Sequence, residues 1–204
     1  MKAKKSIILS VIFISVLFFS CQTVKPPVSQ KEGEITISRS LRDKGILSAA
    51  QLAAFFMSVN PDADRATVER LSGYYIAECR AEGINSDCAF AQMCHETGYL
   101  KFGNLVVPEM HNYCGLGAMD AEHPGEWFDT EELGVRAHVQ HLQAYATTED
   151  VPLNQPLVDP RYSWVHKTKY APTIFELTGT WATDPLYGEK LDQTLTRMEI
   201  SAER

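Results

Sequence analysis

Apolar side chains recur every three or four positions in several stretches after residue 47, and chain-breaking residues separate these stretches. This spacing is typical of amphipathic helices, whose apolar stripe faces a core. In the first stretch, Ser48 can cap a helix and Asn60-Pro61 can end it. The pattern predicts helices over 49–59, about 64–80, within 86–100, 131–145, 173–178 and 186–198. Asn85, Ser86 or Asp87 can cap the third of these helices, and Thr130 can cap the fourth.

Two other regions lack this periodicity. Residues 101–128 contain the turn signal Pro124-Gly125, so we expect a small hairpin or an extended loop there. Residues 147–160 contain three prolines and are also predicted to be a loop. We therefore expect a mainly α fold with a small loop or β-hairpin region, formed by residues 41–204.

The N-terminus has the pattern of an export signal. Three lysines in the first five residues precede an apolar run over 7–19, which ends at Ser20-Cys21. A cysteine directly after a small residue resembles the lipobox of bacterial lipoproteins, which implies that Cys21 becomes the lipidated first residue. The alternatives are a plain signal peptide or an uncleaved anchor, whose apolar run is short for a membrane span.

We accordingly assign residues 1–20 to a lipoprotein signal peptide and residues 21–40, with two prolines and many polar residues, to a flexible linker. The predicted location is the bacterial cell envelope, with a membrane attachment through the lipid. Gln22 after the cysteine favours the outer membrane over the inner one.

Composition and charge narrow the class of partner. The chain has 204 residues, of which 45% are hydrophobic, which allows one domain with a substantial core. Its formal net charge is −7, although three of its basic residues lie in the first 20 positions. Such an acidic surface argues against a nucleic-acid partner, because phosphate binding relies on clustered Lys and Arg.

Four cysteines remain if Cys21 is lipidated, and an even number in an exported chain suggests disulfides. We expect Cys79 to pair with Cys88 across a short turn, and Cys94 to pair with Cys114, but buried free thiols are the alternative. A zinc site from Cys94, His95 and Cys114 is less expected, as is a chelating pair of His138 and His141. We predict no metal and no cofactor.

One carboxylate is out of place on an apolar stripe. At about 100° per residue, Glu96 falls on the same helix face as Ala89, Met93 and Leu100. Apolar surroundings disfavour the charged form of a carboxyl group and raise its pKa. A general acid that cleaves a glycosidic bond needs such a raised pKa, although an ordinary half-buried glutamate has the same pattern.

The segment AFAQMCHETGY (89–99) resembles the catalytic helix of the peptidoglycan glucosaminidases, glycoside hydrolase family 73. Three later segments resemble motifs of this family in the same order: NYCGLG (112–117), DPRYSWV (159–165) and GTWATDPLYGEKL (179–191). The resemblance covers about residues 70–195. It implies a lysozyme-like helical fold in which the helix of Glu96 forms one wall of a glycan-binding groove.

The resemblance also implies roles for individual residues. Glu96 would be the general acid. The binding candidates are aromatic and amide side chains within the matching segments, since aromatic faces suit sugar rings: Gln92, Tyr99, Asn112, Tyr113, Trp181 and Tyr187. Core packing is the alternative for Trp181 and Tyr187.

Many relatives have a longer β-hairpin lobe that supplies a second glutamate, whereas only residues 118–130 are available here. This loop contains four acids, of which Glu122 is our first candidate for the second carboxylate and Asp120 our second. The 2-acetamido group of the substrate could instead assist the reaction, and solvated charge is the ordinary explanation of such a loop.

The sequence thus predicts a monomeric endo-β-N-acetylglucosaminidase that hydrolyses the β-1,4 bond after N-acetylglucosamine in peptidoglycan, or in another glycan containing this sugar. A lytic transglycosylase of the same fold is the alternative within enzymes, and a peptidoglycan amidase is a more distant one. A glycan-binding lipoprotein without catalytic activity is the alternative from another class.

Overall fold

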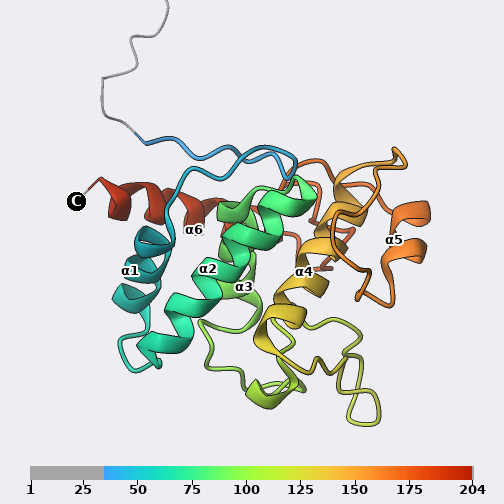
Figure 1. Ribbon diagram of the computed structural model, residues 1–204, viewed down its shortest axis with the longest axis horizontal. Coiled ribbons are helices and arrows are strands. Elements are labelled where there is room, and N and C mark those ends of the chain that lie inside the picture. The colour runs from blue at the N-terminus through green and yellow to red at the C-terminus, as the bar shows by residue number, and fades with distance from the viewer. Residues whose placement is uncertain (1–34, 204) are drawn as a thin grey trace, which may run out of the picture. The chain divides into compact units, whose positions relative to one another are not determined.

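The computed structural model describes residues 35–203, and the predictions for residues 1–34, including lipidation of Cys21, lie outside this range. The described part is mainly helical, as predicted, and contains no strand but only isolated β-bridges such as the one between Ser40 and Thr173. No helix in this part is long and apolar enough to span a membrane. The elements are α1 (Ala49–Val59), α2 (Arg65–Glu82), α3 (Ser86–Glu96), the 3-10 helix η1 (Pro108–Met110), α4 (Glu131–Ala146), α5 (Tyr162–Thr168) and α6 (Tyr187–Ala202) (Figure 1).

Side-chain caps begin the first four α-helices where the sequence contains the expected polar residues. Ser48 forms a capping box with Gln51 at the start of α1, and Asn85 accepts two backbone N–H groups at the start of α3. Thr130 caps α4 in the same way. At the other end of α2, Gly83 takes the left-handed conformation (φ 68°) that closes a helix.

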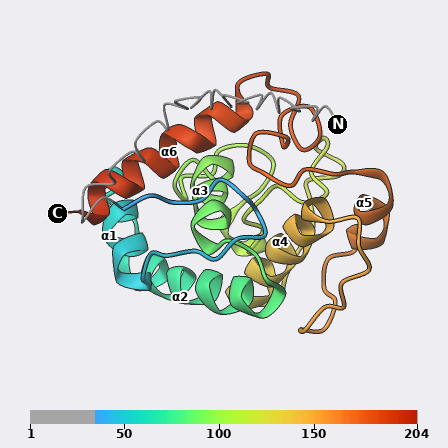
Figure 2. The same cartoon turned by 90° about the horizontal axis from the view of Figure 1, so that it is seen from above.

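The short helix α3 lies in the centre of the domain. Figure 2 shows it surrounded by α1, α2, α4 and α6, and it contacts each of these four helices. Every residue from Ser86 to Cys94 is buried as a result. Only the last turn of α3 reaches the edge of the core, which is where Glu96 lies.

Residues 35–40, predicted as the end of a flexible linker, belong to the folded domain. Ile37 and Leu41 are each only 1% exposed, because their side chains fill the core. Arg39 forms ion pairs with Asp192 and Glu199 of α6. The polar composition of this segment gave no indication of these contacts, because its charged groups form ion pairs with α6, which lies far along the chain.

The loop regions confirm one expectation and correct another. Residues 101–130 form the extended loop rather than the hairpin, and contain η1 and a tight turn in which the Met119 N–H donates to the His123 carbonyl at 2.9 Å. Residues 173–178 form consecutive turns rather than a helix, and the short helix in this part of the chain is α5. Only Val165 of α5 is buried, which explains why its periodicity gives no signal.

The predicted disulfides are absent from the described chain. Cys79, Cys88, Cys94 and Cys114 are buried free thiols. Cys94 packs in the main core, whereas Cys114 packs in a separate small cluster with Leu116 and Ala137, and the Cys88 thiol donates to the Ser38 carbonyl at 3.3 Å. These cysteines therefore serve as small apolar side chains.

Candidate active site

The helix that carries Glu96 ends at this residue, and the chain leaves it through a left-handed turn. Gly98, Tyr99 and Leu100 have φ angles of 57°, 58° and 59°. This conformation costs a non-glycine residue about 1–2 kcal/mol, but hydrogen bonds hold it here, including one of 2.9 Å from the Leu100 N–H to Thr97 Oγ1. The turn stops α3 abruptly, so that the Glu96 side chain lies at the edge of the core.

Glu96 opens into a cavity of about 440 Å³. Four segments form its walls: the end of α3, the loop 102–106, the glycine-containing loop 112–118 and the segment 181–187. Its polar and aromatic lining includes His95, Glu96, Asn112, Trp181, Asp184 and Tyr187.

Both neighbours of the Glu96 carboxyl group donate to the same oxygen. Trp181 Nε1 donates to Glu96 Oε1 at 2.9 Å, and the Tyr187 hydroxyl donates to this atom as well. No side chain or backbone group of the described chain hydrogen-bonds to Oε2. A proton on this carboxyl group therefore resides on Oε2, because Oε1 already accepts two hydrogen bonds.

Burial raises the pKa of Glu96 above its ordinary value, and the hydrogen bonds from Tyr187 and Trp181 oppose this rise without cancelling it. The group is thus held protonated to higher pH than a carboxyl group in water. After it loses its proton, the same two donors stabilise the carboxylate that forms. The arrangement is that of a proton donor whose conjugate base is solvated by the protein.

A chain of buried hydrogen bonds continues from this pair into the core. Gln92 Nε2 donates to the Tyr187 hydroxyl at 2.8 Å, and Gln92 Oε1 lies 3.0 Å from His138 Nε2. His138 Nδ1 lies 2.8 Å from the Tyr75 hydroxyl. Burial lowers the pKa of His138 to about 3, so the ring is neutral at ordinary pH.

This chain fixes the His138 tautomer. Since Gln92 Oε1 can only accept, His138 Nε2 carries the proton, and Nδ1 accepts from Tyr75. The Tyr187 hydroxyl then accepts a hydrogen bond from Gln92, whose other amide atom is also paired, so it can donate only to Glu96. The network therefore positions the Tyr187 hydroxyl against the carboxyl group.

Comparison with known proteins bears on what this site does. Residues 72–200 match the glucosaminidase family model, described as mannosyl-glycoprotein endo-beta-N-acetylglucosaminidase. The chain belongs to the glucosaminidase family. An uncharacterized protein of Borreliella burgdorferi is 40% identical over 158 residues, which are 78% of this chain and 76% of that protein. No solved structure matches the chain.

Within this glucosaminidase domain, three of the six binding candidates from the sequence line the cavity: Asn112, Trp181 and Tyr187. Asn112 organises the glycine-containing loop, since its Nδ2 donates to the Leu116 carbonyl at 2.9 Å and its Oδ1 accepts from the Leu116 N–H at 2.9 Å. Trp181 and Tyr187 contact Glu96 itself.

The other three candidates lie outside the cavity. Gln92 is 1% exposed and acts within the buried network. Tyr99 packs against Phe56, with ring centroids 5.6 Å apart, and Tyr113 is buried beside a different hollow. The matching motifs located these residues on the right segments, but the direction of each side chain depends on the tertiary packing.

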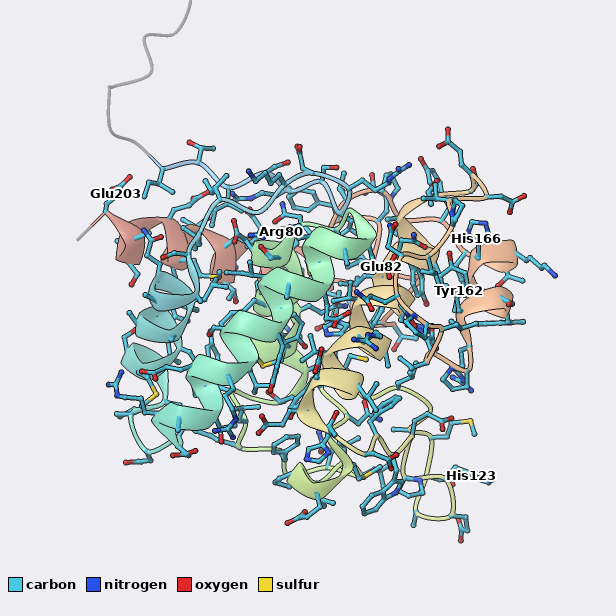
Figure 3. The ribbon with its side chains drawn as sticks, viewed as in Figure 1. Arg80, Glu82, His123, Tyr162, His166 and Glu203 are labelled. Atoms are coloured by element: carbon cyan, nitrogen blue, oxygen red, sulfur yellow. The ribbon has the colours of Figure 1, made fainter. Side chains whose placement is uncertain are left out.

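The two acids named as second carboxylates do not line the cavity of the glucosaminidase domain. Asp120 is exposed and lies 2.8 Å from the ring of His123, which Figure 3 places at the tip of the loop, away from the helices. Glu122 is exposed on the same turn. This turn thus exposes both candidate acids to solvent, whereas Glu126 of the same loop is half-buried beside Gly117.

The cavity contains one other acid, Asp184, which we did not single out although it lies within the segment 179–191. Lys190 Nζ donates to Asp184 at 2.5 Å, and this hydrogen bond lowers the pKa of Asp184. His95 lies beside it and packs against Tyr187, and burial lowers the pKa of its ring. Residues 35–203 contain no cluster of three metal-ligating side chains, so Cys94, His95 and Cys114 form no such group.

Proposed function

We propose that this protein is an endo-β-N-acetylglucosaminidase that hydrolyses the β-1,4 bond after N-acetylglucosamine in peptidoglycan, with Glu96 as the general acid. The observation that carries the proposal is the half-buried Glu96 carboxyl group, which faces a cavity with Oε2 unoccupied and with Oε1 bound by Trp181 and Tyr187. Family membership supports glycosidase chemistry in general.

In the proposed reaction, Glu96 Oε2 protonates the glycosidic oxygen as the bond to the sugar breaks. Negative charge then develops on the carboxyl group. Trp181 Nε1 and the Tyr187 hydroxyl already point at this group, so they stabilise the charge without reorganisation. The raised pKa of Glu96 keeps the proton available near neutral pH.

The positive charge that develops on the sugar must also be stabilised, either by a carboxylate of the protein or by a group of the substrate. Asp120 and Glu122 point to solvent, and Asp184 is held by Lys190. We therefore favour assistance by the 2-acetamido group of the substrate, which requires no enzyme nucleophile close to Glu96. Asp184, as an ionised group in the same cavity, would contribute negative charge.

We further propose that the protein is exported, lipidated on Cys21 and held as a monomer in the cell envelope. The apolar run over 7–19 and the Ser20-Cys21 sequence support this assignment. A peptidoglycan substrate is consistent with such a location. Metabolic labelling with a fatty acid, compared between the full-length protein and a Cys21→Ser variant, tests the lipidation.

The test of activity uses purified cell-wall peptidoglycan and mass spectrometry of the released fragments. The wild type is expected to release fragments with N-acetylglucosamine at the reducing end, and Glu96→Gln is expected to release none. Glu189→Gln, which removes an exposed carboxylate of α6, is the matched control and should cleave like the wild type.

The products separate the rival functions. Fragments ending in anhydro-muramic acid would identify a lytic transglycosylase, and those with reducing-end muramic acid would indicate cleavage of the other glycosidic bond. If the wild type releases nothing but binds the glycan, the protein is a binding lipoprotein. Undiminished cleavage by Glu96→Gln would overturn the role of Glu96.

A further inference from the structure

A second hollow lies beside the cavity of Glu96. Its volume is about 190 Å³, and it shares Cys114, Gly115, Ala118 and Trp181 with the larger cavity. Trp181 therefore lines both spaces, and its indole N–H points at Glu96. The two spaces are therefore adjacent and share one wall.

The charge inside the hollow is positive. Arg161 is its one permanently charged lining residue, and no Asp or Glu lines it. Arg161 is exposed, and no carboxylate of the described chain lies within 4.0 Å of its guanidinium. Within residues 35–203, five other arginines, beginning with Arg39, form ion pairs, and Arg80 and Arg197 form none. In a chain with net charge −7, such a guanidinium has a capacity for an anion that the protein itself does not use.

The backbone of Arg161 is fixed in place. Its N–H donates to Asp159 Oδ1 at 2.8 Å, and Asp159 Oδ2 lies 2.8 Å from His141 Nδ1 of α4. Asp159 is buried, and its own N–H donates to the Gln140 side chain. Arg161 thus begins α5 from a loop that is tied to α4, so binding an anion would require little ordering of the backbone.

The surroundings of Arg161 also contain one buried acid, Asp159, which is held by His141. Burial raises the pKa of the Tyr145 phenol; the Arg161 charge opposes this rise and the Asp159 charge adds to it, so both charges lie near this hydroxyl. At the outer rim Trp164 is 58% exposed, and Lys169 Nζ lies 5.8 Å from the centre of its ring. Asp150 does not line the hollow; it is exposed and pairs with His166 of α5.

We propose that this hollow is a subsite for a carboxylate carried by the glycan chain, with Arg161 as its ligand and the exposed Trp164 as its apolar wall. The proposal rests on the proposed function, in which the substrate alternates a neutral sugar with one bearing a lactyl group and a peptide. Both the free lactyl group and the peptide supply carboxylates. The hollow would make the protein selective for acidic glycans over neutral polymers of N-acetylglucosamine.

The test measures binding separately from turnover, in the Glu96→Gln protein, by titration calorimetry. The probes are peptide-bearing glycan fragments, the same fragments after enzymatic removal of the peptide, and the neutral chitin tetrasaccharide. Because a guanidinium–carboxylate pair is a charge-assisted contact, adding Arg161→Gln is expected to weaken binding of an acidic probe by about ten-fold or more. Binding of the neutral probe should not change.

The comparison of the two acidic probes identifies the source of the carboxylate, since the lactyl group becomes free only when the peptide is removed. Arg161→Lys should restore part of the lost affinity. Arg65→Gln, which removes an exposed guanidinium of α2, is the matched control for charge. Equal weakening of all three probes, or of none, would overturn the subsite.

Cleavage assays with the single variant Arg161→Gln keep the two proposals apart. A raised KM for peptidoglycan with unchanged kcat supports the subsite. If the wild type cleaves no glycan while acidic fragments still need Arg161 to bind, the proposed hydrolysis is wrong and the subsite remains. If the variant cleaves with an unchanged KM, the proposed hydrolysis remains and the subsite is wrong.

Discussion

Replacing Tyr187 with Phe tests how the protein controls its proposed acid. The change removes one hydroxyl, which donates to Glu96 Oε1 and accepts from Gln92 Nε2, and it keeps the aromatic ring. A hydrogen bond to a charged group contributes about 1.5–3 kcal/mol. One pKa unit corresponds to about 1.4 kcal/mol, so we expect the pKa of Glu96 to rise by about one to two units.

The sign of the effect on activity follows from the role of the group. In the proposed reaction the protonated form of Glu96 is the active one, so activity is expected to be lost as pH rises through its pKa. The Tyr187→Phe variant should therefore keep its activity to higher pH, with the alkaline limb of kcat/KM shifted upward by the same one to two units. At the optimum it should be slower by about ten-fold, because the developing carboxylate has lost a donor.

The assay is kcat/KM on soluble peptidoglycan fragments between pH 4 and 9. Tyr74→Phe, in a half-buried tyrosine of α2, serves as the control for loss of a hydroxyl. An unshifted alkaline limb in Tyr187→Phe would refute the reasoning, whatever the loss in rate. The variant also leaves Gln92 Nε2 unpaired, and its unfolding free energy should fall by about 1–3 kcal/mol.

Three further predictions concern stability. Because the pKa of His138 is about 3 in the folded state and about 6.5 when unfolded, stability is full above pH 6.5 and falls by up to about 5 kcal/mol toward pH 3. The free energy of unfolding, measured with urea at several pH values, should show this dependence in the wild type and a weaker one in His138→Gln. An equal dependence in the two proteins would contradict the prediction. A chain beginning at residue 35 should melt like the full protein, whereas one beginning at residue 42 loses Ile37 and Leu41 and about 3–6 kcal/mol of stability. If both chains melt at the same temperature, residues 35–41 do not stabilise the domain and the predicted flexible linker is correct. The chain beginning at residue 35 should titrate four thiols after denaturation without reductant, and should melt equally with and without reductant; fewer thiols would indicate a disulfide.

The sequence predicts the helix starts well where a local signal exists. Ser48, Asn85 and Thr130 act as caps through contacts within their own first turn, so neighbouring residues suffice to locate them. Helix α5 lacks such a signal, because Arg161 makes no side-chain cap and the helix is only seven residues long. Its position depends on α4, against which it packs.

The residues of the candidate site also differ in how well the sequence predicts them. Glu96, Trp181 and Tyr187 belong to segments that resemble the family motifs, and the structure brings all three together. Gln92 belongs to the same motif but points into the core, where its partner is His138, 46 residues further along the chain. A helical pattern cannot tell a polar residue that faces a cleft from one that faces a buried partner.

The cysteines show a different limit. An even number of cysteines predicts disulfides only if the side chains meet, and here Cys94 and Cys114 pack in separate clusters. Their spacing in the sequence contains no information about this separation. Burial raises the pKa of both thiols, which makes them unreactive as well as unpaired.

The N-terminal segment has a mechanical consequence. Residues 37 and 39 bind α6, and residues 38 and 41 bind the cap of α3. Asn85 Nδ2 donates to the Ser38 carbonyl at 3.0 Å, and the Asn85 N–H donates to the Leu41 carbonyl at 2.8 Å. Tension applied to the chain at residue 35 is therefore transmitted to the first turn of the helix whose last residue is Glu96. In a protein tethered through its N-terminus, a pull on the anchor would load the helix of the proposed acid before it reached α2 or α4.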